Sequence, residues 1–326
     1  MSFDLVKRIV GGSPAPSHAY PFAVYLSIET QPSWHAVCGG TLISATHVVT
    51  AAHCVHHAPR PSAVKLGLGS AHIRRQQRHQ ARNITVHPHF DMRTLANDIA
   101  VVHLDRPVAM TPDVHRIPVY FGDIGAGTRI VTMGWGVTTN RPGARTVAAL
   151  NHVQLRVAEP RACRSVDPEF ASSNGPFICT STQPGARDEC NGDSGAPAVV
   201  DMADIPPPLS KRSAAMVRAA ARARAGDEGS DLRLVALTSY GDNARHDAHP
   251  PCGDPSGFGF STHIAYYEQF LTAATGLGRA QLEAPVRLDR HALKTSSAAA
   301  GLLLPPHAVW LQFMTAVIVA LALMCR

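Results

Sequence analysis

Short apolar runs separated by Gly, Pro and Ser recur along most of the chain, and they constrain its fold more than any other feature. Each run has the length of a β-strand, and few stretches show the spacing of an amphipathic helix. Many short strands with frequent turn residues predict an antiparallel sandwich or barrel, so we expect an all-β fold. The runs cover residues 23–28, 40–44, 48–50, 64–68, 84–87, 99–104, 129–133, 153–157, 198–200 and 233–239.

One stretch near the end of the patterned region has helical spacing. Residues 264–271 place Ile264, Tyr267 and Leu271 on one face, together with Phe270. An apolar face of this kind predicts a helix that packs on a core. We therefore expect a single helix that closes the domain.

Composition allows one large domain or two ordinary ones, because the chain has 326 residues and 45% of them are hydrophobic. Lys and Arg outnumber Asp and Glu by 30 to 24, which gives a formal charge of +6. This charge is modest for the length and does not indicate a nucleic-acid partner. The basic residues cluster at residues 74–82 and in an Ala-rich insertion at 201–231. We interpret both segments as solvated loops rather than partner-binding patches.

The cysteines indicate an oxidising, extracytoplasmic environment. The chain has seven, and the absence of a Cys-x-x-Cys motif disfavours a zinc ribbon. Six lie in the patterned region and can pair, but their spacing does not choose among the pairings, and Cys325 is left over. The sequon Asn83-Ile84-Thr85 points the same way, because it permits glycosylation of Asn83. The six are Cys38, Cys54, Cys163, Cys179, Cys190 and Cys252.

The amino terminus does not fit this environment, because residues 1–8 contain Asp4 and lack an apolar run of signal-peptide length. We give the cysteines more weight and expect the natural chain to begin upstream. Arg8 completes a dibasic site directly before Ile9, so we expect cleavage there, with residues 1–8 as a propeptide remnant. The new ammonium of Ile9 needs a buried carboxylate, for which Asp193 is the candidate. The alternative is an ordinary basic linker.

The stretch 192–197 reads Gly-Asp-Ser-Gly-Ala-Pro and contains the candidate nucleophile, Ser194. Glycines beside the serine let the backbone approach a substrate closely. A serine hydroxyl is a weak nucleophile, so it needs a base, an orienting group for that base, and N–H donors for the oxyanion. Taken alone, such a tetrapeptide is more often a surface turn, so the other residues must decide.

A candidate base and its orienting acid lie upstream. His53 follows a β-type run in Thr50-Ala51-Ala52-His53-Cys54, where a disulfide at Cys54 would fix the backbone. Asp98 stands at the start of the apolar run 99–104, where a carboxylate is costly to bury without a donor. An imidazole N–H from His53 would supply that donor and fix the tautomer of the ring.

With these motifs in order, the chain resembles a trypsin-like serine protease of the chymotrypsin family. The resemblance spans residues 9–274 and implies two six-stranded β-barrels with the site in the cleft between them. It implies a triad of Ser194, His53 and Asp98, and an oxyanion hole formed by the N–H groups of Gly192 and Ser194. The motifs are Arg8-Ile9-Val10-Gly11-Gly12, Thr50-Ala51-Ala52-His53-Cys54, Asn97-Asp98-Ile99-Ala100, Gly134-Trp135-Gly136 and Gly192-Asp193-Ser194-Gly195-Ala196-Pro197.

The resemblance also implies the specificity pocket. Asp188 would stand at its base and favour Arg or Lys before the scissile bond, and Ser239, Gly241 and Gly259 would form its walls. Glu189 departs from the family pattern, and it either adds a second acid to the pocket or turns away. If it points inward, one of the two carboxyls would stay protonated.

The same resemblance implies three disulfides and no cofactor. A metal is not expected, because the family's calcium loop needs acids and the stretch from Lys65 to Phe90 has none. The implied pairs are Cys38 with Cys54, Cys163 with Cys179, and Cys190 with Cys252.

The carboxyl-terminal part reads as a linker at 275–307 and a hydrophobic tail at 308–326. Small residues at Ser296, Ser297 and Ala298, then a spacer and an apolar tail, favour a lipid-attachment signal. A membrane span is the main competitor, but the run is short and Arg326 alone is a weak cytoplasmic anchor. A soluble helix is the third alternative.

The sequence thus predicts a secreted or surface-anchored serine endopeptidase that is activated by cleavage after Arg8. Its expected partners are protein or peptide substrates with Arg or Lys at the cleavage position, an activating protease, and a membrane at the tail. The competing hypothesis is a protease-like binding or adhesion module that has lost catalysis. The intact set of His53, Asp98 and Ser194 favours the enzyme.

Overall fold

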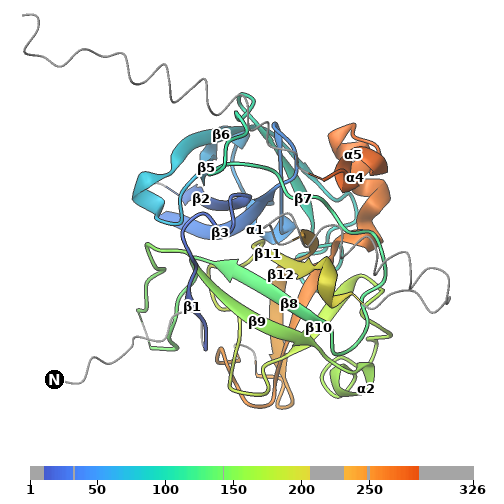
Figure 1. Cartoon of the computed structure of the whole chain (residues 1–326). Coiled ribbons are helices and arrows are strands. Elements are labelled where there is room, and N and C mark those ends of the chain that lie inside the picture. Colours follow the sequence, from blue (N-terminus) through green and yellow to red (C-terminus); the bar gives the residue numbers. More distant parts are fainter. Residues whose placement is uncertain (1–10, 32–33, 142, 206–230, 248–249, 286–326) are drawn as a thin grey trace, which may run out of the picture. The chain divides into compact units, whose positions relative to one another are not determined.

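The computed structural model describes residues 11–31, 34–141, 143–205, 231–247 and 250–285, and Figure 1 shows their arrangement. The predicted cleavage site at Arg8 and Ile9, most of the insertion at 201–231, the lipid-attachment site and the hydrophobic tail lie outside these residues. Among the described helices, none is both long and apolar enough for a membrane crossing.

The amino-terminal half of the described chain forms a closed antiparallel barrel, drawn in blue to green in Figure 1. Its interior is filled by one set of apolar side chains that includes Leu26, Leu66 and Val102, all fully buried. In order around the barrel, the strands are β2 (Ala23–Gln31), β3 (Trp34–Leu42), β4 (His47–Thr50), β7 (Ala100–Leu104), β6 (Gln77–Val86) and β5 (Val64–Leu68).

The carboxyl-terminal half forms a second barrel, which closes because β8 pairs with both β9 and β11. A short strand, β1 (Ser13–Pro14), adds to β9 from outside. The prediction of two six-stranded barrels is confirmed, and every predicted run overlaps a strand. The strands are β8 (Arg129–Gly134), β9 (Asn151–Val157), β10 (Phe177–Ser181), β13 (Gly257–His263), β12 (Leu232–Asn243) and β11 (Pro197–Asp201).

Strand β7 shows why the apolar runs are continuous rather than alternating. Side chains alternate between the two faces of a strand. Val102 and Leu104 point into the first barrel, whereas Val101 belongs to a second cluster that also contains Val199 and Leu237 of the other barrel. Both faces of the strand are therefore buried, and both must be apolar.

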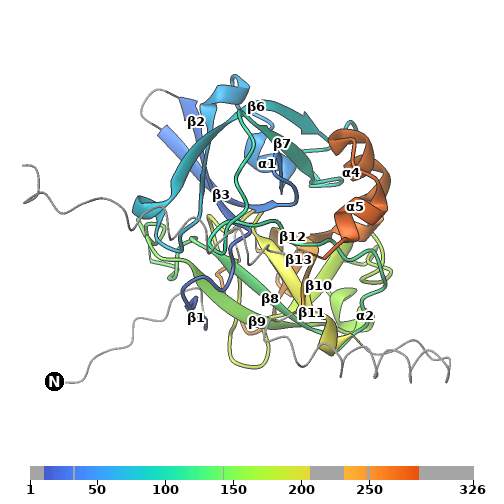
Figure 2. The same ribbon diagram turned by 45° about the horizontal axis from the view of Figure 1, so that its top comes forward.

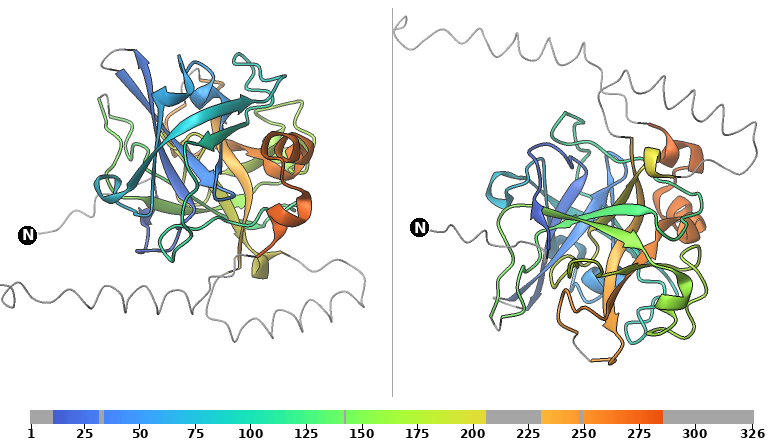
Figure 3. Two further views of the ribbon diagram at one scale, coloured as in Figure 1. Left: turned by 90° about the horizontal axis from the view of Figure 1, so that it is seen from above. Right: turned by 60° about the horizontal axis from the view of Figure 1, so that its bottom comes forward.

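The longer helices follow the last strand and pack beside the barrels (Figures 2 and 3). The predicted helix begins as the 3-10 turn η4 (Ile264–Tyr267), continues as α4 (Glu268–Thr275), and ends at Gly276, whose φ of 68° is left-handed. Packing extends past the expected boundary at 274, because α5 (Arg279–Glu283) buries Leu282 completely. The shorter helices are α1 (Ala52–Val55), α2 (Pro160–Cys163), η1 (Pro61–Ala63), η2 (Ile73–Arg75) and η3 (Met202–Asp204).

Three disulfides connect elements that are distant in the sequence, with the pairing that the resemblance implied. The first links β3 to α1, the second links α2 to β10, and the third joins two loops that are 62 residues apart. The pairs are Cys38–Cys54, Cys163–Cys179 and Cys190–Cys252.

The insertion leaves and re-enters the second barrel at one point. Strands β11 and β12 are antiparallel neighbours, and Asp201 pairs with Leu232. The ends of the segment between them are therefore adjacent in space.

Leu282→Ala should lower the free energy of unfolding by about 2–5 kcal/mol, because it removes a fully buried side chain from the cluster between the barrels. Ala280→Ser, at an exposed position of α5, should cost only about 0.5 kcal/mol. Urea unfolding of both variants measures the difference. Equal losses would show that α5 is not part of the cooperative core.

Candidate active site

The backbone around Ser194 turns tightly between a disulfide and strand β11. Gly192 and Gly195 have φ angles of 95° and 74°, a region that side chains strongly disfavour. A Cβ on Gly195 would also lie 2.2 Å from Thr50 Oγ1. The turn is held by the N–H of Gly195, which donates to Thr238 O at 2.7 Å, and by the N–H of Gly39, which donates to Ser194 O at 2.8 Å. Glycines at these positions are thus required by the fold.

His53 and Asp98 form a hydrogen-bonded pair. His53 lies in α1, directly after β4, and its Nδ1 is 2.8 Å from Asp98 Oδ2. The backbone N–H of His53 donates to Asp98 Oδ1 at 2.9 Å. Because a carboxylate only accepts hydrogen bonds, Nδ1 carries the hydrogen, and in the neutral ring Nε2 is the nitrogen that can accept a proton.

The carboxylate of Asp98 is completely buried and is held by both barrels. The hydroxyl of Ser239 on β12 donates to Asp98 Oδ2 at 2.5 Å, and that of Thr262 on β13 donates to the backbone oxygen of Asp98 at 2.9 Å. Hydrogen bonds to the ionised form make such burial tolerable. Neither role was predicted, because it depends on the positions of β12 and β13, which no motif indicates.

Ser194 and His53 both lie at the Cys38–Cys54 disulfide. His53 Nε2 is 3.8 Å from Cys54 Sγ, and the carbonyl oxygen of Ser194 is 3.6 Å from the same sulfur. The ring of His53 and the backbone of Ser194 thus both reach this sulfur, and the catalytic role of the three residues stays a prediction. In the described part of the chain, His53 and these two cysteines are the only cluster with the geometry of a metal site, but disulfide sulfurs offer no thiolate ligands.

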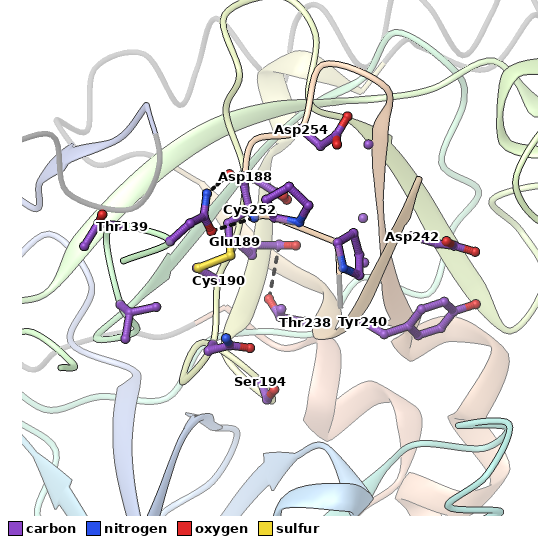
Figure 4. A pocket seen from close by; sticks show the side chains of 18 of the residues that line it. Thr139, Asp188, Glu189, Cys190, Ser194, Thr238, Tyr240, Asp242, Cys252 and Asp254 are labelled. Carbon is purple, nitrogen blue, oxygen red and sulfur yellow. Dashed lines mark hydrogen bonds between the residues drawn. A yellow bond between two sulfur atoms is a disulfide. The ribbon is translucent and has the colours of Figure 1, made fainter. Parts of the chain in front are cut away.

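A pocket of about 660 Å³ opens beside Ser194 (Figure 4). It runs between the turn that carries Ser194, strand β12 and the segment that leads into β13. All residues predicted for the specificity pocket line it, namely Asp188, Glu189, Ser239, Gly241 and Gly259.

Two acids stand side by side in this pocket. Asp188 accepts a hydrogen bond from the N–H of Gly253 at 2.8 Å, and burial raises the pKa of Asp188 to about 6. Glu189 is 9% exposed and accepts a hydrogen bond from Thr238 Oγ1 at 3.1 Å. Burial, and then the neighbouring charge of Asp188, raise the pKa of Glu189 to about 8. Glu189 thus points inward, and at neutral pH it favours the protonated form.

The side chain of Asp193 is buried and packs directly against the backbone at two glycines. Its carboxylate accepts hydrogen bonds from the N–H of Gly136 at 2.7 Å and from the N–H of Cys190 at 3.0 Å. A Cβ on Gly134 or Gly136 would approach the carboxyl atoms to 2.1 Å or 2.5 Å. Burial raises the pKa of Asp193 to about 7, so the site would stabilise a nearby cation. The predicted partner Ile9 lies outside the described residues.

The oxyanion role of Gly192 and Ser194 and the glycosylation of Asn83 stay predictions. Asn83 is exposed on β6, next to an irregularity in its pairing with β7. An exposed asparagine is accessible to modification, which agrees with the prediction.

Comparison with known proteins gives consistent results. A family model described as Trypsin matches residues 9–204. The chain is 32% identical to a trypsin of Phaedon cochleariae over 198 residues, which are 60% of this chain and 74% of that protein. It is 33% identical to serine protease 1 of Rattus norvegicus over 196 residues, or 59% of this chain and 74% of that one. An alignment of 272 residues at 31% identity relates 81% of the chain to 38% of serine protease 56 of Homo sapiens.

Glu189→Gln should change how stability depends on pH. The pKa of Glu189 is about 8 in the folded protein, well above the ordinary value of about 4.3 for an unfolded chain. The stability that comes from this proton is therefore complete below about pH 4 and is lost as pH rises through about 8. The variant keeps an acceptor for Thr238 but cannot ionise. The difference in Tm between the variant and the wild type should therefore shift in favour of the variant as pH rises.

Thermal unfolding at several pH values between about 5 and 9 measures this gain across the titration of Glu189. Glu169→Gln, at an exposed position, is the matched control and should run parallel to the wild type. Parallel curves for Glu189→Gln as well would contradict the assignment of a buried, protonated Glu189.

Proposed function

Because the chain belongs to the trypsin family and is a serine endopeptidase, we propose that it cleaves peptide bonds after Arg or Lys through a triad of Ser194, His53 and Asp98. One observation carries the proposal. The His53–Asp98 pair, with 2.8 Å between Nδ1 and Oδ2, lies with Ser194 at one disulfide, and Ser194 also lines a pocket that contains two acids.

In the proposed reaction, Ser194 Oγ attacks the scissile carbonyl carbon while its proton passes to His53 Nε2. The carbonyl oxygen becomes an oxyanion, which the N–H groups of Gly192 and Ser194 stabilise. The C–N bond then breaks, the leaving amine takes the proton from His53, and an acyl-enzyme remains. A water molecule, deprotonated by His53, attacks the ester and releases the acid. Asp98 stabilises the imidazolium in both halves.

Pairing between Asp98 and the imidazolium is supported by the burial of Asp98. A fully buried carboxylate interacts strongly with a neighbouring cation because little water screens it. The same carboxylate fixes the ring through two contacts, one to Nδ1 and one to the backbone N–H of His53. This geometry leaves only one free ring nitrogen for proton transfer.

The proposed specificity follows from the acids of the pocket. Asp188 and Glu189 line it, and within the described residues neither forms an ion pair with a base of the protein. A cationic substrate side chain would supply the missing countercharge. Arg or Lys before the scissile bond fits this requirement.

Activation by cleavage after Arg8 is part of the proposal. The buried Asp193, which packs against Gly134 and Gly136, supports it, because a new ammonium at Ile9 would pair with that carboxylate. Asp193 precedes Ser194 directly, so this pairing would also fix the backbone of the oxyanion hole.

We further propose an extracellular or cell-surface location. The three disulfides support it, since such bonds persist in oxidising compartments. The apolar tail at 308–326 supports attachment to a membrane, with a lipid anchor favoured over a span. The proposed partners are protein or peptide substrates and an activating protease, with no nucleic acid and no cofactor.

Ser194→Ala should lower kcat for an Arg-containing chromogenic peptide on the order of a millionfold, the magnitude seen in other Ser-His-Asp triads. It should also abolish labelling by a fluorophosphonate. Ser165→Ala, at an exposed position after α2, is the control and should keep both signals. If protein with a free Ile9 and its Ser194→Ala variant behave alike, the chain is a binding module instead.

Arg8→Gln should keep the protein inactive after exposure to a trypsin-like activator, whereas Lys7→Gln should still be cut and become active. The expected loss is roughly a hundredfold or more, the cost of removing one oxyanion donor. Amino-terminal sequencing of the active form should read from Ile9. Full activity of uncleaved Arg8→Gln protein would refute the activation step.

A further inference from the structure

We propose that Glu189 is the carboxylate that binds a lysine before the scissile bond, and that an arginine reaches past it to Asp188. The inference rests on the proposed function, because it concerns the pocket of the same endopeptidase. Glu189, which follows the expected specificity acid Asp188, would then be a second determinant of which cation the pocket accepts, closer to Ser194 than the first.

Glu189 is held across the pocket rather than turned out of it. On one side, Oε1 accepts a hydrogen bond from Thr238 Oγ1 of β12 at 3.1 Å. On the other side, a Cβ built on Gly259 of β13 would lie 3.2 Å from Oε2. Gly259 pairs with Gly241, so the carboxylate sits where two facing glycines keep the walls free of side chains.

In the view of Figure 4, Asp188 lies further from Ser194 than Glu189 does. Asp188 accepts the N–H of Gly253, which follows Cys252 of the Cys190–Cys252 disulfide. In the view of Figure 4, the side chain of Glu189 lies between Ser194 and Asp188. A side chain that enters from Ser194 therefore meets Glu189 first.

Among the described residues, no base of the protein forms an ion pair with Glu189, so a cation of the substrate can balance its charge. Burial raises the pKa of Glu189 most, and the acids Asp188 and Asp193 raise it further, while the hydroxyls of Thr132 on β8 and Thr238 on β12 lower it. Among the described residues that line the pocket, Arg141 is the one base, and it forms no ion pair with either acid. The charged groups around the pocket are Asp188, Asp193, Asp242, Asp254 and Arg141.

The two cationic side chains use such a pair of acids differently. Lysine ends in a compact ammonium on a shorter stem, so one nearby carboxylate is its natural partner. Arginine is longer, and its planar guanidinium can contact two carboxylates at once. Loss of the charge at Glu189 should therefore affect lysine much more than arginine, and loss of the charge at Asp188 should do the reverse.

The test uses two peptides that differ only in Lys or Arg before the scissile bond. Glu189→Gln should lower kcat/KM for the Lys peptide on the order of a hundredfold and for the Arg peptide by roughly tenfold or less, the range for unpairing a buried charge. Asp188→Asn should invert this order. An unchanged Lys-to-Arg ratio in Glu189→Gln, or a ratio that rises, would overturn the proposal.

Glu189→Ser keeps the test valid if the glutamine variant folds poorly, because it also removes the carboxylate with a smaller side chain and should shift the ratio the same way. Fluorophosphonate titration of Ser194 counts the active sites in each protein, and Glu169→Gln controls for the loss of one acid elsewhere. A wild type that cleaves neither peptide refutes the proposed function. A wild type that cleaves both, with the ratio unchanged in both variants, refutes only the role of Glu189.

The pH profile gives an independent readout. Binding a cation requires the ionised carboxylate, so KM of the wild type for the Lys peptide should fall as pH rises from about 6 to 9. In Glu189→Gln the part of this fall above about pH 7 should disappear, because Asp188, with a pKa of about 6, is already ionised there. A fall of the same size in the variant would assign the titration to another group and contradict the proposal.

Discussion

The burial of one carboxylate links His53 to the packing of the two barrels. Asp98 is fully buried at the start of β7, in the first barrel, and its oxygens are held by His53 from that barrel and by Ser239 from the second. Thr262 of the second barrel adds a contact to its backbone. An ionised group at such a site is stable only when all of these donors are in place. The orientation of His53 and the contact between the two barrels are therefore coupled through Asp98.

Much of the fold could be predicted from the sequence, since strands such as β7 bury apolar side chains on both faces. The apolar runs marked strands such as β5 and β7 directly. The pattern missed β10 and β13, because these strands pair with each other in a polar part of the second barrel, where Thr180, Ser261 and Thr262 are buried. It also missed α5, which is too short to show a helical period. Buried polar side chains form hydrogen bonds with partners that are distant in the sequence, so local composition does not reveal that they are buried.

The candidate site, too, could be predicted from the sequence only in part. Short motifs around His53, Asp98 and Ser194 indicated the three residues, because local chemistry demands a particular type at each position. The contacts of Thr238 and Ser239 could not be read from any motif. They follow from the register of β12 and from an irregularity in its pairing between Thr238 and Tyr240. The direction of Glu189 was open for the same reason, since a glutamate beside Asp188 can turn either way until the opposite wall is known.

The pairing of Asp201 with Leu232 makes the junction between β11 and β12 a natural point of modular variation. A segment whose ends meet at one rung of a sheet can change length at little energetic cost, since each doubling adds only about 0.6 kcal/mol of closure entropy. The match to the family model stops at residue 204, just inside this junction, while the barrel resumes intact beyond it. A change in the length of this segment would therefore leave the pairing of β11 with β12 in place.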